Sequence, residues 1–329
     1  MKRTPRRTTF RGPNFLAILV ACMGIGIAQI HFDPIAIGGS PSEAANPSGP
    51  PQVNLPPAPL LPELLNDEAQ LDNSAQAQQA ASAEDPEVLR GIWALKIVSS
   101  MLRKGIDSFQ NVPGYTATFF KQERMHGILG DEQSIELKMK HEPFSVYMKW
   151  TAGDARGQQL IYVEGLNDGN LLVQPGGIRG RLTGVLSLEP DGTMAMSQAR
   201  HPVTQAGLVE LARTILQYQD ADLERGDGFL CELHDNQKFA DRDCYLFTCV
   251  YENASVNADY RKSLIFIDKE LSMPVCVKNY TWAKDANPDT IDEETLAEFY
   301  AYSEIQLQKQ LIAAEFDASN PDYRMRVRR

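Results

Sequence analysis

Residues 142–150 read EPFSVYMKW and alternate between apolar and polar or small side chains. In an extended strand, successive side chains point to opposite faces. One face of this strand therefore carries four large apolar residues: Phe144, Val146, Met148 and Trp150. Something must cover that face, either the protein's own core or a bound apolar guest.

Similar short segments surround this strand on both sides. Turn-forming stretches such as EGLNDGN at 164–170 separate them, which favours antiparallel neighbours. The other expected strands are 115–123, 134–141, 158–165, 170–175, 181–188, 228–234, 243–251, 262–268, 273–282 and 295–308. With residues 144–150, the pattern predicts about eleven strands.

Two amphipathic helices complete the expected fold. Apolar residues recur at three- and four-residue steps from Pro86 to about Gln110, and again from Leu208 to about Tyr218, with Thr204 as the expected N-cap. The sequence contains no internal repeat. It therefore predicts a mainly β, α+β fold with one large antiparallel sheet and helices packed on one face.

The charge of the chain excludes one class of partner. The 329 residues contain 32 basic and 43 acidic residues, and five of the basic ones lie in the first eleven positions. Without those five, 27 basic residues remain against 43 acidic ones, a net charge of −16. Such a surface repels phosphate backbones, so we expect no nucleic-acid binding.

The basic start and the apolar run that follows have the layout of an export signal, which we assign to residues 1–32. Three fates fit it. The chain is cleaved after Ala28, or residues 15–30 remain as a membrane anchor, or Cys22 in the stretch LVAC is lipidated. Each fate places the rest of the chain outside the cytoplasm, in the periplasm or cell envelope, and the second and third tether it to a membrane.

Residues 33–86 differ in composition from the rest of the chain. They contain ten of the 20 prolines, no Lys or Arg and no aromatic residue. Such a segment cannot bury enough apolar surface to offset its ordering entropy. We expect a flexible spacer at 33–86, a folded domain at 87–324 and a short basic tail at 325–329.

The order of segments resembles a known superfamily. YTATFFKQE, then PFSVYMKW, GQQLIYVEG and GNLLVQP follow the order seen in the outer-membrane lipoprotein carriers, LolA and LolB. The later stretches RHPVTQAGLVEL and IDKELSMPVCVKNYTW are similar to an uncharacterised bacterial family of domains of unknown function. The resemblance implies a curved, incomplete antiparallel barrel with helices on its concave face, over an apolar cavity.

In such a half-barrel, the large apolar side chains line the concave face. The residues that this resemblance places there are Phe119, Leu137, Phe144, Val146, Met148, Trp150, Ile161 and Val163. The alternative is that they pack directly on the helices as an ordinary core. Fold alone does not decide between the two.

Four cysteines lie on expected neighbouring strands of an exported domain, where disulfides are permitted. Cys244 and Cys249 are five residues apart and face opposite sides of an unbroken strand. Cys231 opposes Cys244 if the hairpin turns near Gln237, so the expected disulfide joins these two. Buried free thiols remain an alternative, as does zinc bound by Cys231, His234, Cys244 and Cys249.

No catalytic, metal-binding or nucleotide-binding motif is present in the sequence, and we expect no cofactor. The leading hypothesis is a non-enzymatic binding protein that holds a lipid or an acylated protein. The alternative is an interaction or sensor module of the envelope that binds a protein partner. A tight polar pocket with convergent ionisable side chains would instead favour an enzyme.

Overall fold

The computed structural model describes residues 88–285, 287–307 and 310–326. The expected export signal at 1–32 and spacer at 33–86 lie outside these residues, as does the end of the expected basic tail. No helix within the described ranges is long and apolar enough to cross a membrane.

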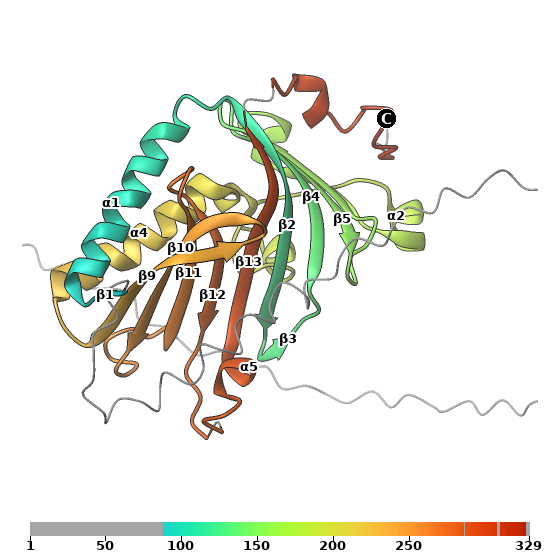
Figure 1. Ribbon diagram of the computed structural model, residues 1–329. Coiled ribbons are helices and arrows are strands. Elements are labelled where there is room, and N and C mark those ends of the chain that lie inside the picture. The colour runs from blue at the N-terminus through green and yellow to red at the C-terminus, as the bar shows by residue number, and fades with distance from the viewer. Residues whose placement is uncertain (1–87, 286, 308–309, 327–329) are drawn as a thin grey trace, which may run out of the picture. The chain divides into compact units, whose positions relative to one another are not determined.

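The described residues form one thirteen-stranded antiparallel sheet (Figure 1). Neighbouring strands follow the order β1-β9-β10-β11-β12-β13-β2-β4-β5-β6-β7-β8, and β3 pairs with β2. The strands are β1 Val88–Arg90, β2 Gly114–Met125, β3 Ile128–Leu129, β4 Gln133–Lys140, β5 Ser145–Ala152, β6 Gln159–Val163, β7 Leu171–Gln174, β8 Leu186–Leu188, β9 Phe229–Phe239, β10 Arg242–Tyr251, β11 Lys262–Asp268, β12 Pro274–Tyr280 and β13 Leu296–Leu307. β1 and β8 are the two ends of the order, so the sheet is an open half-barrel.

The structure has two short strands that were not expected, β1 and β3, and a helix in place of part of one expected strand. β1 takes residues expected as the first helical turn, because Val88 pairs with His234 of β9 and Gly91 breaks the chain with φ 68°. β3 forms a short hairpin with β2. The expected strand 181–188 is instead the end of helix α2, Gly177–Thr183, followed by β8, because Gly184 at φ 70° ends the helix.

Two long helices cover one face of the sheet, which curves around them (Figure 1). They are α1, Ile92–Phe109, and α4, Leu208–Arg225. The N-cap of α4 is Gly207 rather than Thr204, and the helix continues to Gly226, which ends it in the left-handed conformation. We call the side of the sheet that α1 and α4 contact the helix-covered face. The short helices are α3 Thr193–Met196, α5 Ile291–Thr295, η4 Asn167–Gly169, η5 Val203–Gln205 and η6 Ala313–Phe316.

Helix α1 approaches the sheet closely at one glycine. A Cβ atom on Gly105 would collide with the carbonyl oxygen of Ser272 and lie 2.7 Å from Sδ of Met273. Ser272 and Met273 lie at the end of the turn between β11 and β12. The absence of a side chain at Gly105 therefore sets how deeply α1 packs.

Gly105→Ala should destabilise the domain although alanine is the better helix former. Overpacking costs about 1–3 kcal/mol, which exceeds the roughly 1 kcal/mol that alanine gains in helix propensity. Denaturant unfolding measures the difference. Ser100→Ala, at an exposed position of the same helix, is the control and should leave stability unchanged or slightly raised. Equal stability of both variants would mean that α1 moves away from the turn at little cost.

The C-terminal segment covers the opposite face of the sheet. The ring of Tyr323 stacks on Tyr147 of β5 with centroids 4.1 Å apart. The cluster also contains Ile161, Val163, Leu311, Phe316, Ala318 and Met325. Met325 is buried in it, so the packed chain continues past the boundary expected at residue 324.

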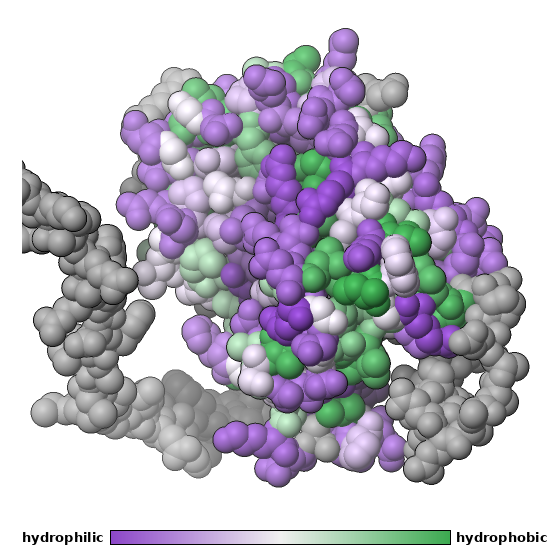
Figure 2. All heavy atoms as spheres, turned by 90° about the vertical axis from the view of Figure 1, so that its left-hand side faces the viewer, coloured by the Kyte–Doolittle hydropathy of each residue, from purple (hydrophilic) through white to green (hydrophobic). Residues whose placement is uncertain are grey.

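Helix α1 also carries apolar residues on its outer side. Trp93 is 63% exposed and Ile97, one turn later, is 39% exposed. Figure 2 looks onto the side of the domain where α1 lies and shows hydrophobic residues grouped among hydrophilic ones. Lys96 covers part of the Trp93 ring, with its Nζ atom 4.8 Å from the ring centre.

Candidate functional site

A cavity of about 230 Å³ lies on the helix-covered face of the sheet. Its wall includes Leu95 of α1, Ile215 of α4, Met148 of β5 and Val277 of β12. Apolar cavities of roughly 150 Å³ already bind a guest the size of benzene. The space is therefore large enough for a small apolar group or for part of an acyl chain.

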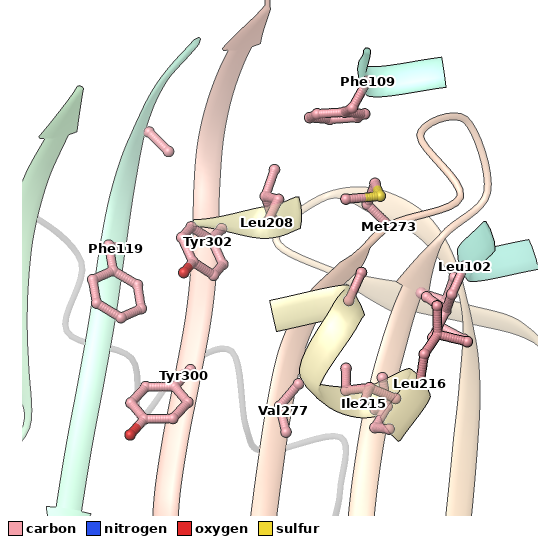
Figure 3. Packing of buried hydrophobic residues seen from close by; sticks show 14 of the residues in the cluster. Leu102, Phe109, Phe119, Leu208, Ile215, Leu216, Met273, Val277, Tyr300 and Tyr302 are labelled. Atoms are coloured by element: carbon pink, nitrogen blue, oxygen red, sulfur yellow. The ribbon is translucent and has the colours of Figure 1, made fainter. Parts of the chain in front are cut away.

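Aromatic side chains form one wall of this cavity. Figure 3 shows Phe119 on β2 and Tyr300 and Tyr302 on β13, all on the side of the sheet where α4 carries Ile215. The rings of Phe119 and Tyr302 stack with centroids 4.7 Å apart. Trp150 of β5 also lines the cavity, and its Nε1 donates to Oε1 of Gln133 at 2.8 Å.

The residues expected on the concave face separate into three groups: cavity wall, solid core on the same face, and core on the opposite face. Phe119, Met148 and Trp150 line the cavity. Leu137 and Val146 are fully buried in the same core cluster, and Phe144 packs against it. Residues 144–150 therefore contribute both to solid core and to cavity wall.

Ile161 and Val163 were assigned to the wrong face. Ile161 pairs with Tyr147, and both residues pack under the C-terminal segment on the opposite side of the sheet. Leu160 points into the cavity instead. Both faces of β6 are covered, so its apolar residues do not alternate with polar ones, and only the pairing with β5 sets which face is which.

The residues 189–206 connect β8 to α4 and close one side of the cavity. Pro190, Met194, Ala195 and Val203 of this connection line it. Met194 is 63% exposed, so this connection contributes both to the cavity wall and to the protein surface.

A polar group of residues holds the 189–206 connection to the sheet. We call it the Glu298 cluster; it consists of Glu123, Arg200, His201, Tyr260, Asn279, Glu298 and Tyr300. All but Arg200 belong to the cavity wall. The cluster brings together residues from β2, β12 and β13, the 189–206 connection and the loop before β11.

Glu298 is at the centre of this cluster and is only 3% exposed. Its Oε1 accepts hydrogen bonds from Asn279 Nδ2 at 2.7 Å and Tyr260 OH at 2.8 Å. Its Oε2 accepts from Arg200 Nε at 2.9 Å and contacts His201 Nε2 at 3.0 Å. Both carboxylate oxygens are fully engaged.

These contacts shift the pKa values of both partners. Burial alone would raise the pKa of Glu298. The hydrogen bond and charge of His201, and the hydrogen bonds from Asn279 and Tyr260, lower it to about 2. Burial lowers the pKa of His201, yet its contacts with Glu298 outweigh this and raise it. Glu298 is thus a carboxylate at neutral pH, with no proton to donate.

A second carboxylate in the wall is also paired. Glu123 is 8% exposed, and its Oε1 accepts from Tyr300 OH at 2.6 Å. Its Oε2 lies 3.0 Å from Lys121 Nζ. Burial, the first cause, and the two carboxylates raise the pKa of Tyr300 well above its ordinary value, so this hydroxyl acts as a donor.

Polar residues also occur where α4 borders the cavity. Its buried stripe begins with Leu208 and Ala212 and continues through Gln219 and Asp222. Asp222 accepts from Tyr251 OH at 2.7 Å and from Arg225 Nη1 at 2.6 Å. Burial is the largest influence on Asp222 and raises its pKa.

The expected disulfide between Cys231 and Cys244 is wrong. The β9–β10 hairpin turns at Ala240 and Asp241, both with positive φ, rather than near Gln237. Cys244 therefore opposes Gln237, and Cys231 opposes Cys249. Among the described residues, Cys231, Cys244 and Cys249 are present as thiols.

The same register separates the proposed zinc ligands. Cys231 and Cys249 belong to the core on the helix-covered face, whereas Cys244 belongs to a cluster on the other face. His234 contacts Glu232. The four residues therefore do not converge on one site.

If the domain is oxidised, we expect a disulfide between Cys231 and Cys249, whose Sγ atoms lie 3.1 Å apart. Cys244 opposes Gln237 and belongs to the cluster on the other face of the sheet, so this residue should remain a thiol. Non-reducing peptide mapping after mild oxidation measures the connectivity. A Cys231–Cys244 peptide would contradict the β9–β10 register.

Glu298, Glu123 and Gln219 were not anticipated as site residues from the sequence. Each carries a local signal, because a polar residue occupies a position whose neighbours on the same face are apolar or aromatic. Glu298 alternates with Tyr300 and Tyr302, and Gln219 follows Leu216 at helical spacing. The signal marks buried polar groups, but it does not say which of them meet.

Comparisons with known proteins give a family and several similar structures. The mycobacterial lipoprotein LppX from Mycobacterium tuberculosis is 13% identical, with a TM-score of 0.39 over 68% of this chain and 99% of that one. A LolA superfamily protein from Nitrosomonas europaea is 14% identical, with a TM-score of 0.29 over 67% and 97%. The MucA/MucB complex of Pseudomonas aeruginosa contains a chain 10% identical, with a TM-score of 0.37 over 67% and 60%.

At these identities and TM-scores the likenesses carry no conclusion about function. No curated protein matches the sequence. The model of one family, described as "Protein of unknown function (DUF1571)", matches residues 112–325. This confirms the expected membership of an uncharacterised family. The chain belongs to the DUF1571 family.

Proposed function

We propose that this domain is a non-enzymatic binding protein that holds a lipid or the acyl chain of a modified protein. The observation that carries the proposal is the cavity of about 230 Å³ on the helix-covered face, walled by Phe119, Met148 and Trp150. Concave sites lined mainly by apolar and aromatic groups are typical of small-molecule binding.

A long acyl chain needs more room than the cavity offers in this state. The 189–206 connection forms one side of the cavity and includes the exposed Met194. It is fixed to the sheet chiefly through Arg200 and His201. Outward movement of this connection would lengthen the cavity without disturbing the sheet.

The Glu298 cluster places convergent ionisable side chains at the cavity, which is the feature that would favour an enzyme. Its carboxylates are already paired, however, and the pKa of Glu298 is about 2. A general acid or base near neutral pH needs a pKa close to the working pH. Glu298 is therefore not a general acid or base, and the ring of His201 is held by its contact with that carboxylate, so we assign this cluster to holding the 189–206 connection rather than to catalysis.

The place of action that we propose is the periplasm or cell envelope. The support is the basic and apolar start of the chain together with the proline-rich stretch at 33–86. Retention of residues 15–30 or lipidation of Cys22 would tether the domain to a membrane. Mass determination of the mature protein from its host distinguishes these two from cleavage after Ala28.

Native mass spectrometry of the full chain, extracted from its host in mild detergent, tests the proposed binding. We expect additional mass from bound lipid, which disappears after delipidation and returns on adding lipid. An apo mass, together with no uptake of an apolar fluorescent dye by the delipidated protein, would overturn the proposal.

A second candidate is an interaction module that binds a protein partner. It is favoured by the outer side of α1, where Trp93 and Ile97 are exposed one turn apart. A pull-down from envelope extract should then recover a stoichiometric protein that survives delipidation and is lost with Trp93→Ser. Ser100→Ala, exposed on the same helix, is the control.

A further inference from the structure

One polar atom in the cavity region has no partner. Gln219 of α4 lines the cavity and is only 3% exposed. Its Oε1 accepts a hydrogen bond from Ser99 Oγ of α1 at 2.8 Å, which fixes the amide. Its Nε2, within the described residues, is buried without a hydrogen-bond partner.

Buried amide donors are satisfied in most native proteins, and an unsatisfied one is costly. Among the described residues, no acceptor lies within hydrogen-bond distance of it, although Asp222 is on the same helix. Gln219 lies in the cavity wall but its Nε2 is covered by neighbouring atoms, so an acceptor atom on a bound guest would complete it once the guest displaces the atoms that cover it.

The charges around the cavity indicate what kind of guest this is. Each carboxylate in the wall is paired with a cation: Lys121 with Glu123, Arg225 with Asp222, and Arg200, joined by His201 when it is protonated, with Glu298. A charged guest would lose its hydration without gaining an unpaired counter-ion. The wall therefore suits an uncharged guest that carries an acceptor oxygen.

We propose that the ligand of this cavity is an uncharged acyl ester or acyl amide whose carbonyl oxygen accepts a hydrogen bond from Nε2 of Gln219. This inference rests on the proposed binding function and names its ligand class. The acyl chain lies against the apolar wall formed by residues such as Met148 and Phe119, and the carbonyl oxygen completes the amide of Gln219. A plain hydrocarbon leaves that amide unsatisfied, and a fatty-acid anion brings an unpaired charge.

Four ligands of similar chain length separate these possibilities: methyl decanoate, N-methyldecanamide, undecane and decanoate. Displacement of a cavity-bound apolar fluorescent dye from the full-length, delipidated protein gives their relative affinities. We expect the ester and the amide to bind about tenfold more tightly than undecane, the effect of one buried hydrogen bond. Decanoate should bind more weakly than its methyl ester.

Gln219→Leu removes the donor and should abolish the preference for the carbonyl compounds while leaving undecane binding unchanged. Gln217→Leu makes the same chemical change at an exposed position of α4 outside the cavity wall and should keep the preference. If Gln219→Leu does not fold, Gln219→Met supplies an unbranched side chain of similar length for the same measurement.

The outcomes distinguish this inference from the proposed function. Binding of none of the four ligands, nor of the dye, would overturn both. Equal binding of ester and undecane, unchanged by Gln219→Leu, would overturn only the ligand class and assign the amide to a bound water. Tighter binding of decanoate than of its ester would also overturn it, because the wall would then favour an anion.

Discussion

Glu298→Gln should lower the free energy of unfolding by roughly 3 kcal/mol between pH 4.5 and 6.5. The pKa of Glu298 falls from 4.5 to about 2 on folding, and each unit corresponds to about 1.4 kcal/mol. The side chain is almost fully buried, so solvent screening does not reduce it much. The substitution also leaves Arg200 and His201 without their carboxylate partner.

The destabilisation by Glu298→Gln should shrink both below and above this pH range, because two groups with opposite pKa shifts contribute to it. The pKa of Glu298 is lower in the folded state, so its stabilisation is complete above 4.5 and is lost as the pH falls toward 2. The pKa of His201 is higher in the folded state, so its contribution is complete below 6.5 and is lost as the pH rises through the folded value. The difference between parent and variant should therefore be largest between 4.5 and 6.5.

Thermal unfolding of parent and Glu298→Gln across this pH range measures the effect. Glu293→Gln, an exposed residue of α5, is the matched control and should change stability little. Limited proteolysis supplies a second readout, because release of Arg200 and His201 should expose the 189–206 connection. Equal stability of parent and variant at every pH would mean that Glu298 is not paired in solution.

Met148→Gln should weaken binding of an apolar guest by at least about tenfold while costing less than about 1 kcal/mol of stability. Met148 lines the cavity, where the new amide can meet water in the absence of a guest. Binding of an apolar guest then requires removal of that water and burial of the amide. Dye titration and thermal unfolding, done side by side, measure the two effects.

Met139→Gln is the matched control for this experiment. Met139 is 1% exposed in the same core cluster but is not part of the cavity wall. The same change there buries an amide in solid core and should cost about 1–3 kcal/mol with little effect on binding. If Met148→Gln were as destabilising as Met139→Gln, and the parent bound no apolar guest, the wall at Met148 would be ordinary core.

The sequence alone determined the class of fold and the family. Period-two alternation in strands such as 144–150 and the three- and four-residue steps in α1 and α4 reflect burial of one face of each element. Burial of one face is a local property that each segment records in its own residues. Ten of the eleven expected strands were found for this reason, and of the expected strand 181–188 only Leu186–Leu188 forms a strand, β8. β1 and β3 were missed because both are short and depend on their partners for pairing.

Tertiary structure decided the features that require two segments to meet. The face of Ile161 depends on its register with Tyr147, because apolar layers cover both sides of β6. The partner of Cys231 depends on a turn at Ala240, one in which the backbone adopts positive φ.

The polar groups of the cavity depend on the fold most of all. Glu298 meets Arg200 and His201, almost 100 residues away, only because β13 lies beside β2 and the 189–206 connection crosses their helix-covered face. Gln219 continues the buried stripe of α4, which the sequence records, but only packing against Ser99 shows that half of its amide is left without a partner. Hydrogen bonding and pairing of charges depend on distances in space, and the local periodicity of a sequence does not contain those distances.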